Sequence, residues 1–299
     1  MANIEPRFIF RGDAVGAAGR LVRNARGEVV NQTVPVLAAS SLPVIGGLSE
    51  AKAENCTVPM PGSEQPFLCV GQASTSAVSE GDGLDKNHTT TVKCSVEKVQ
   101  VLDRVTIDSV KVSIVSQHPP EEEVARIAPD VAEMTGLKLD GHELAVTFDL
   151  KTFQRNPTKQ AFIDYYGKTA SFREKFCWRV SADSAKRLRP PEYKGIIIAT
   201  VVSSIKWVGD PLPGVEICGN VLKWAGVGTI YLGELLISKH SRRLTMFRME
   251  IGGNTEGLRT APKARSKALK LTAARAPEAD QGSGEVVVGE TQTNGTTIP

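Results

Sequence analysis

Residues 105–115 read Val-Thr-Ile-Asp-Ser-Val-Lys-Val-Ser-Ile-Val, and they decide the fold class because apolar and polar side chains alternate along almost the whole run. A period of two sends successive side chains to opposite faces of an extended chain, so the run predicts a β-strand with one buried face. The preceding part of the chain repeats the pattern in short apolar runs separated by Gly, Pro, Ser and Asn. Strands are therefore expected at Arg7–Phe10, Asn31–Ala38, Pro66–Ser74 and Thr89–Val101, with a glycine-rich turn at Gly12–Gly19.

Two segments after this strand have the features of helices. Pro119, followed by a second proline and three glutamates, is typical of a first helical turn, where proline is tolerated and acids face the positive helix end. Apolar residues continue at spacings of three and four up to Gly136, which predicts a helix kinked at Pro129. Asn156-Pro157 predicts the N-cap and first residue of a second helix, which runs to Gly167.

Strands are expected again between and after these helices. The run Ile196–Val202 is apolar at every position except Thr200, which predicts a central strand covered on both faces. These features together predict a mainly β protein, an antiparallel sandwich or open barrel with two peripheral helices. The segments rich in β-branched and aromatic residues are Leu144–Leu150, Phe176–Val180, Ile196–Val208, Val215–Trp224, Thr229–Ser238 and Leu244–Ile251.

The composition changes after Gly252-Gly253. Residues 1–256 are expected to form the β-rich body, either as one unit or as two subdomains at 1–150 and 151–256. Residues 257–299 are expected to be a disordered, flexible tail, first basic and then acidic, because they carry too little apolar periodicity to offset the entropy of ordering. The basic part contains six cations and no acid: Arg259, Lys263, Arg265, Lys267, Lys270 and Arg275.

These six cations are candidate contacts for nucleic acid or for an acidic partner. Basic side chains that neutralise phosphates give salt-dependent binding without sequence preference. A solvated terminus that only adds solubility is the alternative interpretation. The whole chain has 36 basic and 33 acidic residues and a net charge of +3, which excludes a surface that binds polyanions everywhere.

The cysteines show no metal or redox spacing, because no two of them lie within four positions of each other. Buried free thiols are expected, and a disulfide among the first three is the alternative. No apolar run in residues 1–16 is long enough for a signal peptide, and no run reaches the length of a membrane helix, so neither a leader nor membrane insertion is expected. The five cysteines are Cys56, Cys69, Cys94, Cys177 and Cys218.

Patterns for catalysis or cofactor binding are weak throughout. Gly226-Val227-Gly228 precedes a strand and not a helix, which excludes a dinucleotide fingerprint. Carboxylates near strand ends could form a glycan hydrolase site, and the candidate pairs are Asp140 with Glu143 and Asp149 with Glu234. The histidines are expected in exposed turns, and no metal or other cofactor is expected, because none has a second ligand at metal-binding spacing. They are His88, His118, His142 and His240.

The order of several turn-and-strand segments resembles a known family. The segments read FRGDAVGAAG at Phe10–Gly19, TVPVLAASSLPVIGG at Thr33–Gly47, VKCSVEKVQVLDRVTI within Thr91–Ile107 and GLKLDG at Gly136–Gly141. Over roughly residues 7–150 the chain resembles bacterial extracellular β proteins of the choice-of-anchor type. The resemblance implies a surface-exposed β domain with no established activity.

These features favour a non-enzymatic structural or interaction protein, a homo-oligomer that assembles in a surface layer, a fibre or a shell. Within Leu244–Ile251, alternation would bury Phe247 on one face and present Met246, Arg248 and Glu250 on the other, as candidate contacts between copies. A virion or nucleoprotein component that binds nucleic acid through the basic tail is the first alternative. A glycan hydrolase is the second.

Overall fold

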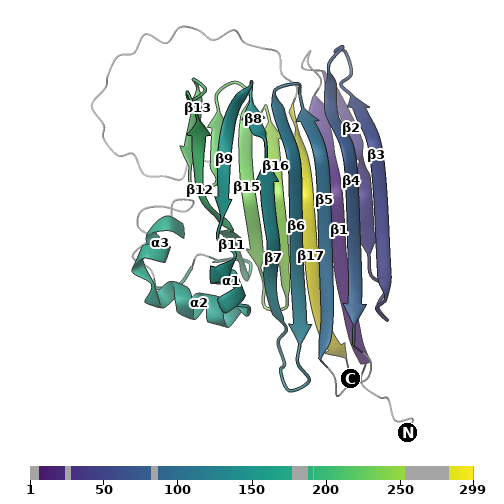
Figure 1. The fold of residues 1–299 in the computed structure, drawn as a ribbon, viewed down its shortest axis with the longest axis vertical. Helices are drawn as coiled ribbons and strands as arrows, with labels where there is room; N and C mark the ends of the chain where they lie inside the picture. The colour runs from purple at the N-terminus through teal and green to yellow at the C-terminus, as the bar shows by residue number, and fades with distance from the viewer. Residues whose placement is uncertain are drawn as a thin grey trace.

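The protein is a sandwich of two antiparallel sheets built from long strands (Figure 1). The sheets pack face to face and do not close into a barrel, so the predicted mainly β class and the sandwich alternative are confirmed. The computed structural model describes residues 7–23, 28–81, 87–176, 188–190, 192–252 and 283–298.

Nine strands of the described residues form the first sheet, and in it the first and the last of the described strands are neighbours. A hairpin of β13 (Val215–Cys218) and β14 (Val221–Trp224) adds to its path through the pairing of β14 with β15. The seven strands of the path follow in the order β10 (Glu192–Tyr193), β11 (Ile196–Thr200), β15 (Gly228–Ile237), β16 (Ser241–Ile251), β17 (Ser283–Ile298), β1 (Arg7–Arg23) and β2 (Val29–Ser41).

The second sheet has eight strands, and its inner face packs against the first sheet. One strand, β7 (Arg126–Thr135), pairs with β6 beside the main path. The path itself follows the order β12 (Val202–Val208), β9 (His142–Phe148), β8 (Leu137–Leu139), β6 (Val105–His118), β5 (His88–Val101), β4 (Pro66–Glu80) and β3 (Leu48–Pro59).

The described residues form three short helices, which lie together beside one side of the sandwich: α1 (Lys151–Arg155), α2 (Lys159–Lys168) and α3 (Ala170–Phe176) (Figure 1). The second predicted helix corresponds to α2. Its N-cap is Thr158 and not Asn156, because the Thr158 hydroxyl accepts a hydrogen bond from the backbone N–H of Ala161 at 3.1 Å.

The helix expected from Pro119 to Gly136 is wrong, because this segment contains β7. Pairing with β6 slips by one residue at Asp130, so the buried positions change from odd numbers, such as Ile127, to even numbers, such as Met134. A bulge of this kind turns a spacing of two into a spacing of three. The resulting mixture of spacings between apolar residues resembles the periodicity of a helix in the sequence.

Most of the long strands also contain one residue that takes no part in the pairing with neighbouring strands, and these residues lie level with one another across each sheet. We call the two resulting rows of residues the bulge rows. At each row the pairing of two neighbouring strands skips one residue on each strand, and every second residue of the row has a positive φ. The rows are Gly233, Met246, Gly289, Gly16 and Ala38 in the first sheet and Asn55, Gly71, Lys98, Asp108 and Gly136 in the second.

The bulge rows explain why the glycine-rich turn expected at Gly12–Gly19 is wrong. These residues lie inside β1, where the buried positions change from Phe10 and Ala14 to Ala17 and Leu21 across the row. Because neighbouring strands insert a residue at the same level, the pairing register survives while the alternation in each sequence breaks.

Two glycines of the first row are required by close packing between the sheets. A Cβ atom on Gly16 would lie 2.8 Å from the Cβ of Ala73, and one on Gly289 would lie 2.8 Å from a methyl group of Val110. Ala73 and Val110 belong to the opposite sheet. The glycines therefore permit an approach that no larger residue allows without movement.

The central strand expected at Ile196–Val202 is also wrong. The segment divides into β11 and β12, which belong to different sheets, and the side chains of Ile196 and Ile198 are exposed. Val201 lies between the two strands, is fully buried, and donates its backbone N–H to the carbonyl of Gly233 at 2.9 Å. The apolar run therefore marks the place where the chain crosses between sheets.

The expected tail is wrong for residues 283–298, which form β17 in the interior of the first sheet, between β1 and β16. Val286 and Val288 of this strand are fully buried. The rest of the expected tail, residues 257–282, lies outside the described residues. Residues 177–180 of the expected strand Phe176–Val180 lie outside them too, and Phe176 itself ends α3.

Candidate functional site

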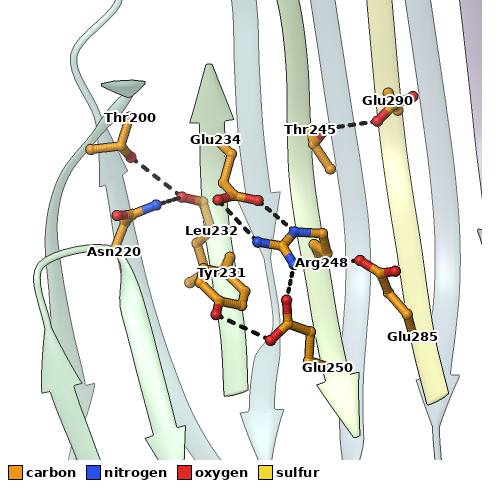
Figure 2. A network of polar contacts seen from close by, with 10 residues as sticks. All are labelled: Thr200, Asn220, Tyr231, Leu232, Glu234, Thr245, Arg248, Glu250, Glu285 and Glu290. Atoms are coloured by element: carbon orange, nitrogen blue, oxygen red, sulfur yellow. Dashed lines mark hydrogen bonds and ion pairs between the residues drawn. The ribbon is translucent and has the colours of Figure 1, made fainter. Parts of the chain in front are cut away.

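A network of charged side chains lies on the outer face of the first sheet (Figure 2). Arg248 on β16 donates to Glu234 on β15 at 2.7 Å and also bonds to Glu250. A weaker contact of 3.4 Å reaches Glu285 on β17, and the guanidinium lies 3.8 Å from the ring centre of Tyr231. Three carboxylates from three adjacent strands therefore surround one cation.

The network holds Arg248 firmly in its charged form. Burial disfavours the guanidinium charge, but the hydrogen bonds and charges of Glu234 and Glu250 outweigh it and raise the pKa of Arg248. Burial and the charge of Glu250 raise the pKa of Tyr231, whose hydroxyl donates to Glu250 at 3.2 Å. These side chains satisfy one another within one molecule, which favours a role in fixing β15, β16 and β17 together.

The structure places the expected assembly contacts differently from the sequence analysis. Met246 is fully buried, so its expected exposure is wrong: it belongs to a bulge row, where the alternation of β16 breaks. Phe247 is fully buried as expected. Arg248 and Glu250 do lie on the outer face, but β16 is an interior strand between β15 and β17 and offers no free edge.

Three of the four carboxylates considered for hydrolysis bind a neighbouring side chain or backbone group. Asp140 forms an ion pair with Arg104, and Asp149 accepts hydrogen bonds from the backbone and hydroxyl of Thr152 at 3.2 and 2.5 Å. Glu234 binds Arg248, as described above. Glu143 is exposed on β9. These contacts stabilise a turn at Asp140, the start of α1 at Asp149 and the first sheet at Glu234.

Two of the four histidines are buried, which corrects the expectation of exposed turns. His88 and His118 lie directly opposite each other at the tips of β5 and β6, and the ring of Phe8 stacks on His88 with centroids 4.1 Å apart. Burial lowers the pKa of both rings, and the neighbouring His88 lowers that of His118 further. Sequence spacing gave no signal for this pair, because only the strand register brings the two residues together.

The thiols that the structure describes are free. Cys56, Cys69 and Cys94 form no disulfide, so that alternative is wrong for these three, and Cys218 is free as well. Burial raises the pKa of Cys94 to about 12, which leaves it a neutral thiol. Cys177 lies outside the described residues.

Three further observations concern ligands and surroundings. In the part of the chain that the structure describes, no group of three or more His, Cys, Asp or Glu side chains could hold a metal ion. No helix there combines the length and apolar character needed to cross a bilayer. The six candidate polyanion contacts, Arg259, Lys263, Arg265, Lys267, Lys270 and Arg275, all lie outside the described residues.

A hollow of about 520 Å³ lies between α2 and the segment that precedes β7. Its charged side chains already have partners. Lys239 pairs with Glu123 at 3.1 Å, and Lys159 pairs with Glu192 at 2.8 Å. The hollow therefore offers little uncompensated charge to a ligand.

The remaining candidate is the side of the sandwich where both sheets end, at β2 and β3 (Figure 1). We call this side the open end. Neither strand has a further strand partner among the described residues. Exposed apolar side chains gather here: Val36 is 55% exposed on β2, Leu48 is 63% exposed on β3, and Ile45 in the connecting turn is 82% exposed.

The edge of β3 is more regular than the other long edge that the second sheet presents. On β7, Pro129 removes a backbone donor and the slip at Asp130 bends the strand, and both features discourage the addition of another strand. On β3, pairing with β4 continues without interruption from Leu48 to Glu54. The open end therefore presents a straight strand edge beside exposed apolar side chains.

Comparison with known proteins gives a family but no characterised relative. Residues 8–238 match the sequence profile of a family described as a domain of unknown function (DUF8256). The matched range ends just after β15, so β16 and β17 lie beyond it. No curated protein and no solved structure matches the chain significantly. Because the profile covers most of its length, the chain belongs to the DUF8256 family.

Proposed function

We propose that the protein is a non-enzymatic structural or interaction protein that assembles with copies of itself through the open end. The observation that carries this proposal is that both sheets end on one side in long strands, of 13 residues in β2 and 12 in β3. Unpaired backbone groups along a strand edge bind a further strand readily, and monomeric proteins usually protect such edges. The exposed side chains of Val36, Ile45 and Leu48 add apolar area to the same side.

The opposite side of the sandwich supports the proposal by contrast. There the first sheet ends in β10, which has two residues, and in the four-residue strand β13. Short edge strands are one of the ways in which proteins avoid unwanted pairing. The first sheet thus ends in short strands on one side and in the long strand β2 on the other.

A surface-exposed, extracellular location is part of the same proposal and is supported by the resemblance to choice-of-anchor proteins. Pairing of strand edges supplies one of the contacts that a layer or a fibre needs, and continued growth needs a second contact surface. The nucleic-acid alternative depends on the cations between Arg259 and Arg275 and stays a prediction, which salt-dependent retention on a nucleic-acid column would test.

Light scattering coupled to size-exclusion chromatography, over a concentration series of the full chain, tests the proposal. We expect the apparent mass to rise with concentration. Leu48→Glu should shift this rise to higher concentration, because it replaces an exposed apolar side chain by an acid on an edge that already carries Glu50 and Glu54. Val208→Glu is the matched control: Val208 is 54% exposed but lies on β12, at the other side of the sandwich. A monomer at every concentration would exclude assembly.

A further inference from the structure

We infer that the partner of β3 is the β3 strand of a second copy, paired antiparallel about a twofold axis in a register selected by Glu50, Lys52 and Glu54. This inference rests on the proposed function, because it names the partner at the same site.

The edge is straight over seven residues. Each residue of β3 from Leu48 to Glu54 pairs in turn with β4, and the first irregularity is Asn55, a member of a bulge row with φ of 51°. A second strand can therefore continue the sheet along Leu48–Glu54 at the ordinary strand spacing of about 4.8 Å. Beyond Asn55 the chain bends and the pairing would have to follow it.

The side chains of this stretch alternate strictly between two faces. Ala51 and Ala53 are partly buried against the core, whereas Glu50, Lys52 and Glu54 are exposed on the outer face. Residues that stand opposite each other in an antiparallel pair point to the same face of the sheet. A register that placed Ala51 opposite Lys52 would set inward-facing and outward-facing residues against each other, so only registers centred on a residue remain.

The order of charges then selects among these registers. A twofold axis through Ala51 places Glu50 of each copy opposite Lys52 of the other, and an axis through Ala53 does the same for Lys52 and Glu54. An axis through Lys52 places the two lysines opposite each other and Glu50 opposite Glu54. Opposite charges stabilise a cross-strand pair and like charges destabilise it, so the alternation of acid, base and acid favours the first two registers.

The three side chains are available for such pairs. None of them forms an ion pair with another described residue, although oppositely charged neighbours lie two positions apart along the strand. A seven-residue edge is only about 23 Å long, so the contact is smaller than the roughly 1,600 Å² of a typical stable interface. We therefore expect association that is weak and depends on concentration, with the charges deciding which strands pair.

Two variants with opposite charge test the inference directly. Lys52→Glu leaves three acids on the outer face of β3, and the double variant Glu50→Lys/Glu54→Lys leaves three bases. We expect each variant alone to lose association in analytical ultracentrifugation, because every register now opposes like charges. An equimolar mixture of the two should recover it as a heterodimer, since acids then face bases. The triple variant Glu50→Lys/Lys52→Glu/Glu54→Lys, which inverts the pattern, should associate with itself.

Lys93→Glu is the matched control, because it changes the net charge as Lys52→Glu does but lies on the interior strand β5. It should leave association unchanged. If the wild-type chain associates and the mixture of opposite variants does not, the β3 pairing is overturned while assembly through another surface stands. If the wild-type chain is monomeric at all concentrations, the proposed function itself fails.

Discussion

The two sides of the sandwich end their sheets in different ways. At the open end, the sheets finish in β2 and β3, which are long, have no described strand partner on their outer edges and lie beside exposed apolar side chains. At the opposite side, which we call the closed end, the chain crosses between the sheets at Val201, the last strands are short, and the helices α1–α3 lie alongside (Figure 1). Aromatic rings, such as those of Phe153 and Phe162, pack between these helices and the sheets.

This difference indicates that the closed end contributes mainly to the stability of the fold and the open end mainly to association between copies. Apolar side chains at the closed end are buried in the molecule and contribute to the free energy of unfolding. Those at the open end remain in contact with water unless another molecule covers them. Substitutions at the closed end should therefore lower stability and spare association, and substitutions at the open end should do the reverse.

Phe162→Ala should have the largest effect. Phe162 is fully buried on α2 and its ring stacks on Phe153 with centroids 5.7 Å apart. Removing a buried phenylalanine side chain costs about 3–5 kcal/mol, which chemical denaturation would measure. Phe162→Leu, which keeps most of the volume, should cost clearly less. Loss of association by folded Phe162→Ala protein would contradict the separation of the two ends.

Gly289→Ala tests whether the close contact between the two sheets at the first bulge row contributes to the stability of the sandwich. Gly289 and Gly141 both have positive φ, 66° and 83°, but only at Gly289 would a Cβ contact another side chain, at 2.8 Å from Val110. Gly289→Ala and its control Gly141→Ala should each lower the free energy of unfolding by about 1–2 kcal/mol, because alanine disfavours the left-handed backbone. Gly289→Ala should lower it by about 1–3 kcal/mol more, because its Cβ overpacks the contact with Val110. Equal losses would show that the sheets can separate at this position without cost.

The bulge rows also set the limit of what the sequence could predict. The strand at Val105–Val115 and the burial of Phe247 were predictable, because alternation continues on each side of Asp108 and again from Phe247 to Ile251. The segments of β1 and β7 were misassigned, because an extra residue shifts the buried face within the strand. That shift depends on a neighbouring strand with the same insertion, which no local pattern reveals.

The open end was not predictable for a related reason. Arg248 on β16 was expected to be an edge contact, but the order of strands in the sheet decides which strand is an edge. The missing neighbour was β17, whose segment looked like a polar tail because its buried positions include Thr291 and Thr293, which alternate with Glu290 and Gln292. Pairing with β1 on one side and β16 on the other supplies the stabilisation that its composition lacks.

Lowering the pH should weaken the fold at the strand tips, where His88 and His118 are buried. Both pKa values lie below the ordinary 6.5, mainly because burial disfavours the charged ring; the charge of Glu122 opposes the shift at His118, and His240 adds to it. The unfolded chain therefore binds more protons below about pH 6.5, so stability is complete above that pH and falls as the pH drops through the folded-state values. Denaturation at several pH values would measure this.

The double variant His88→Gln/His118→Gln is the control for this pH dependence. It removes both titrating rings, so its stability should change less between neutral and mildly acidic pH than that of the wild-type chain. An unchanged slope would assign the effect to other groups. Because the pair lies at strand tips and not on the edge of β3, we expect the mutations to leave association at neutral pH unchanged.

Val36→Glu should have the smallest effect, and it compares the two strand edges of the open end with each other. Val36 is 55% exposed on β2, so the substitution should change the free energy of unfolding by no more than about 0.5 kcal/mol. The edge of β2 is less suited to pairing than that of β3, because Pro35 lacks a backbone donor and Ala38 has a positive φ of 50°. We therefore expect Val36→Glu to reduce association less than Leu48→Glu does, when both are compared by light scattering at equal concentrations. If the two variants reduce it equally, both edges take part in the contact and the unit of assembly is the whole open end; if Val36→Glu has the larger effect, β2 and not β3 is the strand that pairs.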